Sequence, residues 1–231
     1  MGVTAIIGLQ WGDEGKGKIV DALSDGADFV ARCQGGANAG HTVYVDGRKF
    51  VLHLVPSGIL REGVTCLIGS GVAVDLEILA GELKGLEEAG IRTSGRLVVS
   101  RRAHVVLPYH RSADRAEESS RGAGRIGTTM RGIGPCYGDK YARVGLRVGD
   151  MGEASSLDDR LAALARAHPG AAGAAPAFDV EEAREYCAAH LAMTSELAGD
   201  VGSILQSAVA SGKRVVLEGA QGFLLDVDHG T

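Results

Sequence analysis

The chain has 231 residues, which is enough to bury a sizeable core in one large domain or two small ones. Hydrophobic residues make up 45% and charged residues 23% of the chain, values close to globular averages that exclude bulk disorder. The net charge of −5 argues against broad binding to nucleic acid or to anionic membranes. We therefore expect a soluble, cytoplasmic protein that engages neither nucleic acid nor a membrane.

The first part of the chain alternates apolar runs with helical patterns. A continuous apolar run at Val3–Leu9 predicts a strand buried on both faces of a parallel sheet, and it is far too short to cross a membrane. Residues 15–26 have helical spacing, and residues 27–33 return to a strand pattern. Two alternating runs between residues 41 and 55 flank Asp46-Gly47, which predicts a β-hairpin.

The same rhythm continues along the chain. Residues 64–69 predict another buried strand, residues 75–90 an amphipathic helix that ends at Gly90, and residues 95–100 a strand. This alternation indicates an α/β fold whose mainly parallel central sheet is flanked by helices, as in P-loop NTPases. After about residue 150 the patterns are mostly helical, until a last strand at 214–220.

Two segments differ from the rest in composition. Residues 121–147 carry six Arg or Lys and one acid, with glycine throughout. Residues 169–177 are of low complexity and predict a loose surface connection. We expect residues 1–231 to form a single α/β domain. Because the chain ends just past a glycine-rich strand exit, we also expect this domain to be the N-terminal part of a longer catalytic chain.

Glycine and cysteine usage indicate the kind of site to look for. Glycine accounts for 35 of 231 residues, about 15%, against roughly 7% in ordinary proteins. The glycines cluster beside polar residues without a collagen-like period, which favours loops that cradle ligands. The four cysteines, at 33, 66, 136 and 187, lie far apart and form no C-x-x-C pair, which favours reduced thiols over a disulfide framework or a zinc site.

The stretch "GLQWGDEGKGK", Gly8–Lys18, follows the first predicted strand and has features of a phosphate-binding loop. It departs from the P-loop pattern because six residues, rather than four, separate Gly8 from Gly15, and because Gly17 stands where Ser or Thr would hold magnesium. A strand, a glycine-rich turn and a helix still direct backbone N–H groups and the positive helix end at an anion. Lys16 adds a mobile positive charge for phosphate oxygens.

The alternative interpretation of this loop is structural. Asp13 and Glu14 would then only cap a helix that begins near Gly15. Capping explains neither the glycines of the loop nor the position of Lys16 and Lys18 beside two carboxylates. We therefore predict that the loop binds phosphate.

A second glycine-rich cluster, "QGGANAGHT" at residues 34–42, follows the second predicted strand. Ligands of open α/β sheets bind outside the carboxyl ends of the strands, so both clusters are expected at one rim. Asn38 offers an amide, Gly40 a bare backbone carbonyl, and His41 a group that can donate a proton near neutral pH. A structural role is the alternative for His41, and it is the interpretation we adopt for the histidines without such neighbours: His53, His104, His110, His168 and His190.

The stretch "GAGRIG" at residues 122–127 matches G-x-G-x-x-G in form only. A polar helical pattern precedes it, not a buried strand, so we reject a dinucleotide-binding fold. The residues that follow predict a mobile basic loop that clamps a second phosphate, with a solvated charge run as the alternative. The candidates in this loop are Thr128, Thr129, Arg131 and Arg143. Gln221, between glycines after the last strand, occupies a further rim position.

Four long motifs, in this order, resemble the adenylosuccinate synthetase family: "QWGDEGKGK", "GGANAGHT", "IGTTMRGIGP" and "EGAQGFLLDVDHGT". The stretches "LHLVPSGIL" and "ARVGLRVGD" are also similar, so the resemblance runs from Val3 to Thr231. It implies a ligase that joins IMP and L-aspartate into adenylosuccinate, the step that commits IMP to AMP. The family uses GTP and Mg²⁺, and the reaction passes through 6-phosphoryl-IMP.

The resemblance also implies residue roles. Asp13 would be the base that deprotonates the purine ring, His41 the acid, and Asp13 with the Gly40 carbonyl the magnesium ligands. The residues implied to contact GTP are Gly12, Asp13, Glu14, Gly15, Lys16, Gly17, Lys18, Gly40, His41 and Thr42. The residues implied to contact IMP are Asp13, Glu14, Gly15, Lys16, Asn38, Ala39, Gly40, His41, Thr129, Arg143 and Gln221. The family is homodimeric, and Arg143 would reach the IMP of the neighbouring subunit.

The chain departs from the family pattern at two points. The family continues beyond the position of Thr231 to its aspartate and guanine sites, so we expect the isolated chain to be inactive or poorly folded, with an open sheet edge. Met130 stands where we expect a small residue such as glycine. The alternatives are a regulatory GTP-binding switch, another small-molecule phosphotransferase and a non-catalytic remnant.

Overall fold

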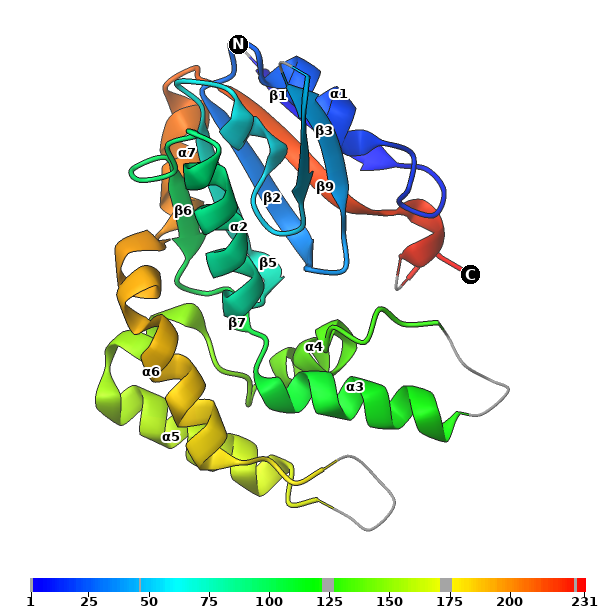
Figure 1. Ribbon diagram of the computed structural model, residues 1–231, viewed down its shortest axis with the longest axis vertical. Coiled ribbons are helices and arrows are strands. Elements are labelled where there is room, and N and C mark those ends of the chain that lie inside the picture. The colour runs from blue at the N-terminus through cyan, green and yellow to red at the C-terminus, as the bar shows by residue number, and fades with distance from the viewer. Residues whose placement is uncertain (1, 46, 122–126, 171–175, 227) are drawn as a thin grey trace.

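A parallel sheet forms the centre of the protein. The computed structural model describes residues 2–45, 47–121, 127–170, 176–226 and 228–231 (Figure 1). The sheet order is β1–β9–β2–β5–β6–β8, with β7 paired to β5, and each of these pairs is parallel. The strands are β1 (Gly2–Gly8), β2 (Phe29–Gly36), β5 (Thr65–Val74), β6 (Leu97–Ser100), β7 (His104–Val105), β8 (Ala198–Gly199) and β9 (Arg214–Gly222). The predicted α/β fold with a mainly parallel sheet is confirmed.

A separate antiparallel hairpin joins β3 (His41–Val45) and β4 (Arg48–Leu52). Val45 lies opposite Arg48, so the turn has two residues, and its second residue, Gly47, has a φ of 76°. A two-residue hairpin turn that follows the strand twist needs this left-handed conformation, which glycine adopts freely. The predicted hairpin is confirmed, although Asp46 itself lies outside the described residues.

Helices pack on both faces and at one end of the sheet. They are α1 (Lys16–Ser24), α2 (Leu76–Glu88), α3 (Pro108–Ser120), α4 (Ile133–Ala142), α5 (Ala154–Ala167), α6 (Val180–Leu197) and α7 (Val201–Ala210). Short 3₁₀ turns are η1 (Ser57–Leu60), η3 (Val148–Gly152) and η4 (Phe223–Leu225). The helix predicted at 75–90 is α2: the Asp75 carboxylate accepts the Ile78 N–H at 3.1 Å at its start, and Gly90 follows its end with a φ of 83°. No described helix is long and apolar enough to span a membrane.

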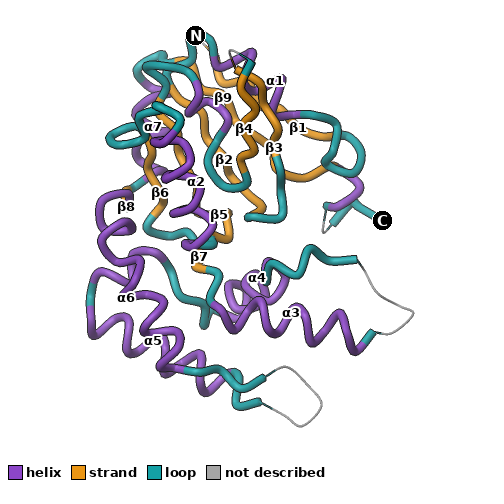
Figure 2. The backbone as a smooth tube through the Cα atoms, in the orientation of Figure 1, coloured by secondary structure: helices purple, strands orange, loops and turns teal. Residues whose placement is uncertain are grey.

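Two layers of side chains bury the sheet. On one face α7 contributes Val201 to a cluster with Ala31 of β2 and Leu67 of β5. On the other face α1, α2 and the hairpin pack over the same strands, with Val20 and Leu79 in the core (Figure 1). Helices α3 to α6 gather beyond one end of the sheet (Figure 2).

The helical region confirms one prediction and extends it. Helices α5 and α6 follow residue 150 as predicted, but the helical layer already begins at Pro108, where the fixed φ of proline suits the first turn of α3. Part of the predicted basic loop is also a helix, α4. Residues 122–126 and 171–175, which contain most of the G-x-G-x-x-G match and of the low-complexity connection, lie outside the described residues.

Strand β1 differs from its prediction. Among the described strands it pairs only with β9, and its side chains are largely exposed, with Val3 at 49% and Ile7 at 69%. The prediction of burial on both faces is therefore wrong for β1, whereas the burial predicted for the strand at residues 64–69 holds for most of β5. An apolar run indicates a strand, but the run itself carries no information on what covers the strand's two faces.

His104 predicts a pH dependence of folding. This side chain of β7 is 5% exposed, and its Nδ1 has no hydrogen-bond partner among the described residues. Burial, followed by the charges of Lys140 and Arg147, lowers the pKa of His104 from 6.5 to about 4. Below pH 6.5 the unfolded chain therefore binds a proton that the folded chain refuses, and the free energy of unfolding falls as the pH falls.

We expect the variant His104→Asn to lose this acid sensitivity. Between pH 6.5 and 4 one such group lowers the free energy of unfolding by up to about 1.4 kcal/mol per pH unit. Urea unfolding of the wild type and the variant at several pH values in this range measures the difference. Parallel pH curves for the two proteins would contradict the assignment.

Candidate active site

Three loops meet at the carboxyl ends of β1, β9 and β2. A side chain at Gly12 would come within 3.1 Å of the Gly222 backbone nitrogen, so these two glycines let the loops cross in contact. The first turn of α1 packs as closely on β3, because a Cβ at Gly17 would lie 2.7 Å from the His41 Cβ. The rim predicted to hold both glycine-rich clusters is therefore confirmed.

The carboxylate of Glu14 fills the interior of the first loop. Its Oε1 accepts the backbone N–H of Gln10 at 2.8 Å and of Gly12 at 3.3 Å, and its Oε2 accepts Lys16 Nζ at 3.1 Å. Backbone N–H donors, those of Glu14 itself and of Gln10 first, lower the pKa of Glu14 to about 2. The loop thus surrounds a pair of anionic oxygens with backbone and lysine donors, which is the chemistry of a phosphate cradle.

Helix α1 starts at the cradle without a side-chain cap. Its N-cap is Gly15, with a φ of 84°, and neither Asp13 nor Glu14 caps it. The interpretation of these two acids as helix caps is therefore wrong. Lys16 is 4% exposed and also donates to the Gly12 carbonyl at 3.0 Å, whereas Asp13 is exposed and makes no side-chain hydrogen bond or ion pair within the described part of the chain.

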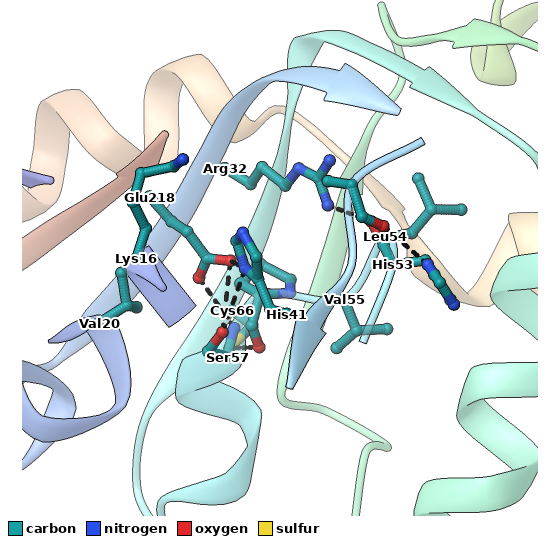
Figure 3. Close-up of polar contacts among 12 residues, drawn as sticks. Lys16, Val20, Arg32, His41, His53, Leu54, Val55, Ser57, Cys66 and Glu218 are labelled. Carbon is teal, nitrogen blue, oxygen red and sulfur yellow. Dashed lines mark hydrogen bonds and ion pairs between the residues drawn. The ribbon is translucent and has the colours of Figure 1, made fainter. Parts of the chain in front are cut away.

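His41 forms a buried pair with Glu218 of β9. Its Nδ1 lies 2.5 Å from Glu218 Oε1, and the two residues are 7% and 1% exposed. Ser57 holds the carboxylate from the other side through its backbone N–H, at 2.9 Å to Oε2. Figure 3 shows these three side chains converging, with Cys66 beside them. The other ring nitrogen, Nε2, is buried and has no partner among the described residues.

A buried arginine shapes the second cluster. Arg32 is 1% exposed and donates to the carbonyl oxygens of Gly36 at 2.7 Å and of Gln34 at 3.3 Å. It also donates to the carbonyl oxygen of His53 (Figure 3). Burial lowers the pKa of Arg32, and the charge of Glu218 opposes this shift. The guanidinium therefore ties the end of β2 to His53, the residue that follows β4.

The turn that carries Asn38 and Gly40 is held by neighbouring polar groups. Asn38 Oδ1 accepts the Gly36 N–H at 3.2 Å, and His53 Nδ1 lies 2.7 Å from the Ala39 carbonyl oxygen. Glu82 of α2 accepts the His53 N–H at 2.6 Å and so fixes that histidine in turn. His53 has the structural role predicted for it.

The loop before α4 is tied to α3. The Asp114 carboxylate accepts Thr128 Oγ1 at 2.9 Å and the Gly132 N–H at 2.9 Å. Between these anchors Thr129 is exposed, and Met130 has a φ of 53°, a conformation that favours glycine. This geometry suits the small residue, such as glycine, that the family pattern leads us to expect at position 130.

Helix α4 docks on the rim through a tyrosine. Tyr137 Oη donates to the carbonyl of Gly71 in β5 at 2.7 Å and accepts the N–H of Gly35 near the end of β2 at 3.0 Å. Arg143 ends α4 with a φ of 65° and an exposed side chain. The predicted basic segment, residues 121–147, therefore contacts the rim through its one described helix, α4.

A cavity lined by described residues lies away from this rim. It has a volume of about 650 Å³ and lies between the β3–β4 hairpin and the start of β6. The Arg96 guanidinium in its wall donates to the carbonyl oxygens of Val64 at 3.1 Å and Ile59 at 2.9 Å, so it ties backbone segments together. The glycine-rich rim is the better candidate site.

The family profile of adenylosuccinate synthetase matches residues 5–231 of this sequence. The chain belongs to the adenylosuccinate synthetase family. It is 48% identical to the adenylosuccinate synthetase of Heliobacterium modesticaldum, covering 100% of this chain and 55% of that protein. It is also 48% identical to that of Vibrio vulnificus, covering 98% and 52%. The chain therefore spans about half the length of the curated relatives it matches.

Solved structures agree with this assignment to the adenylosuccinate synthetase family. A fully ligated adenylosuccinate synthetase from Plasmodium falciparum superposes with a TM-score of 0.86 at 35% identity, covering 99% of this chain and 53% of that one. A succinoaminodeoxyadenylate synthetase from cyanophage S-2L, bound to dGMP and dATP, superposes with a TM-score of 0.62. At 22% identity the phage enzyme shows the shared fold alone.

The residues marked by resemblance to adenylosuccinate synthetase fall into two groups. The first loop, the second cluster and Gln221 lie together at the rim, where Gly12 contacts the 221–222 backbone and Gly17 contacts His41. Thr129 and Arg143 lie on the α3–α4 segment, and no hydrogen bond joins either side chain to the first loop among the described residues. The described residues contain no cluster of three or more His, Cys, Asp or Glu side chains suited to a metal.

Three charged residues shape the site without having been singled out from the sequence: the buried Arg32 and Glu218 and the half-buried Glu82. Arg32 and Glu218 are the isolated charges of two otherwise apolar strands, "FVARC" and "VVLEGA". A charged residue is rarely buried unless it is paired, so its presence within a buried strand pattern is a usable signal. Glu82 sits in an exposed-looking helical pattern and gives no such signal.

Proposed function

We propose that this chain is the N-terminal part of a GTP-dependent ligase that joins IMP and L-aspartate into adenylosuccinate. The observation that carries the proposal is the anion cradle of the first loop, which faces the buried His41–Glu218 pair across Gly17. A cradle alone fits many nucleotide-binding proteins. A cradle with a carboxylate and a histidine at its edge fits one that also moves protons.

In this proposal the first loop and α1 hold the phosphates of GTP. Lys16 exchanges the Glu14 carboxylate for phosphate oxygens, and the N–H groups of Gln10 and Gly12 turn to the same ligand. The proposed contacts to GTP are Gly12, Asp13, Glu14, Gly15, Lys16, Gly17, Lys18, Gly40, His41 and Thr42. The proposed contacts to IMP are Asp13, Glu14, Gly15, Lys16, Asn38, Ala39, Gly40, His41, Thr129, Arg143 and Gln221.

Asp13 and His41 are the proposed proton carriers. The exposed Asp13 carboxylate removes the ring proton of IMP, so that the 6-oxygen can attack the γ-phosphorus of GTP and displace GDP. His41 Nε2, which has no partner among the described residues, donates a hydrogen bond or proton to the phosphate side of that step. Aspartate then displaces the phosphoryl oxygen at carbon 6, which releases inorganic phosphate and forms the C–N bond.

The residues present fit a magnesium ion. Asp13 contributes a free carboxylate and Gly40 an exposed backbone carbonyl, and Mg²⁺ is commonly bound through one or two carboxylates together with substrate phosphates and water. When bound, the ion would neutralise charge that develops on the transferred phosphoryl group. We further propose a cytoplasmic homodimer in which the exposed Arg143 reaches the IMP of the partner subunit.

Phosphate release from GTP tests the proposed function. We expect the full-length protein to release phosphate only when IMP is present, and to form adenylosuccinate, followed by its absorbance, when aspartate is added. A regulatory GTP-binding switch would hydrolyse GTP without IMP. Phosphate release that depends on another small molecule would indicate a different phosphotransferase. Either result would overturn the proposal.

A further inference from the structure

Glu218 is the buried acid that contacts the proposed proton donor. We propose that Glu218 is a positioning residue, which holds His41 in the ring orientation and tautomer from which its Nε2 meets the substrate. This inference rests on the proposed function, because it takes His41 as a group that acts on the phosphate side of the reaction. Glu218 itself lies beneath His41 and acts through it.

The contacts of the Glu218 carboxylate fix it in one place. Oε1 lies 2.5 Å from His41 Nδ1 and 3.4 Å from Ser57 Oγ, and Oε2 accepts the Ser57 N–H at 2.9 Å. The glutamate stands on the inner strand β9, opposite Ile6 of β1 and Arg32 of β2. The backbone of Glu218 is fixed in the sheet and both of its carboxylate oxygens are bonded. The side chain is therefore held in one orientation.

This arrangement selects a tautomer of His41. An ionised carboxylate only accepts hydrogen bonds, so the proton on the facing nitrogen, Nδ1, is the one that the pair favours. Nε2 has no partner among the described residues and is left to face the substrate. It donates when the ring also carries a proton on Nε2, and the Glu218 carboxylate beside Nδ1 stabilises that imidazolium during the transfer. The ring packs against Gly17 in the first turn of α1, next to the phosphate cradle.

Positively charged side chains lie close to the pair. Arg32 lies on the neighbouring strand and interacts with it electrostatically, and Lys16 lies on α1 beside Gly17 (Figure 3). Burial, and after it the charge of Glu218, raises the pKa of the Cys66 thiol in β5 well above its usual value. Cys66 therefore stays neutral and adds no negative charge beside the carboxylate. A buried carboxylate is unfavourable for packing alone, because removing its charge from water carries a large desolvation penalty.

The first experiment reads the tautomer directly. In the full-length protein labelled with ¹⁵N-histidine, we expect the imidazole shifts of His41 to report a proton on Nδ1 in the wild type. In Glu218→Gln this preference should weaken or invert, because the amide can donate as well as accept. A proton predominantly on Nε2 in the wild type, or identical His41 shifts in the variant, would overturn the proposal.

The second experiment measures coupling in catalysis. We expect Glu218→Gln to lower kcat by about 10- to 100-fold with little change in KM for GTP or IMP, less than the loss in His41→Asn. Added to His41→Asn, it should lower kcat by no more than about twofold, because residues that act as a unit are not additive. Glu218→Asp should restore part of the lost kcat. The exposed Glu62→Gln serves as the matched control.

The outcomes separate the two proposals. Full additivity of the two variants, or an unchanged kcat in Glu218→Gln, would overturn the positioning role. Absence of IMP-dependent phosphate release in the wild type would overturn the proposed function and, with it, the action of His41 on substrate. The NMR result would in that case still decide whether Glu218 sets the tautomer of His41.

Discussion

Asp13→Asn should leave a full-length protein that binds GTP and IMP but turns over about 10²–10⁴-fold more slowly, the usual contribution of a general base. Asparagine has the shape of aspartate but cannot accept the ring proton of IMP. The Asp13 side chain is exposed and makes no hydrogen bond or ion pair with the described residues, so the substitution removes no contact that holds the loop. The cradle around Glu14 and Lys16 stays intact, which is why binding should persist.

Steady-state kinetics and calorimetric titration with GTP separate the two effects. The matched control is Asp25→Asn, the same change at an exposed residue that ends α1 on the side away from the loop. We expect this control to have wild-type kcat. If Asp13→Asn kept kcat within a few fold of the wild type, Asp13 would not be the base, and another group would have to accept the proton of IMP.

The phosphate cradle was predictable from the sequence because local chain geometry decides it. A strand, a glycine-rich turn and a helix in succession direct backbone N–H groups to one point, whatever the rest of the fold does. The sequence also predicted the common rim, because parallel strands end on one side of a sheet. It did not predict that Glu14 fills the cradle in the structure, since that depends on the path of the loop between Gly8 and Gly15.

The supporting contacts of the site were not predictable in the same way. The contact between Glu218 and His41 joins residues 177 positions apart in the chain, and it depends on β9 lying between β1 and β2. The sequence order of the strands does not give that arrangement. The exposure of β1 was missed for a related reason, because the apolar pattern of a strand is the same at the edge of a sheet as in its middle.

Asp139 should be the residue whose loss destabilises the helical layer most. Its carboxylate is 4% exposed and bridges two histidines: Oδ2 lies 2.9 Å from His110 Nε2 on α3, and Oδ1 lies 2.7 Å from His168 Nε2 at the end of α5. His110 Nδ1 accepts the Leu107 N–H at 2.9 Å, so the proton of this ring faces Asp139. Burial raises the pKa of Asp139, but the contacts with His110 and His168 outweigh it and lower the pKa overall.

We expect Asp139→Ala to lower the free energy of unfolding by about 3–5 kcal/mol, because it leaves the buried His110 N–H unpaired and removes the acceptor of the partly exposed His168. Asp139→Asn should cost less. Its amide oxygen keeps one bond, and His168, which is a quarter exposed, can change tautomer to accept the other. The exposed Asp159→Ala on α5 is the control, and it should stay within about 0.5 kcal/mol of the wild type. Urea unfolding of the full-length protein measures all three.

The pH dependence of the Asp139→Ala effect sharpens this prediction. Because the folded-state pKa of Asp139 is lowered, its stabilising contribution is present above the ordinary carboxyl pKa of 3.8 and is lost as the pH falls through the lowered value. The wild type and Asp139→Ala should therefore differ fully at pH 7 and converge in strong acid. A difference that stayed constant down to pH 2 would mean that the carboxylate acts through its volume, and that the charge-assisted bonds to His110 and His168 contribute little.

Since α3 also carries the Asp114 anchor of the Thr128–Gly132 loop, loosening this cluster should lower the affinity for IMP before the protein unfolds.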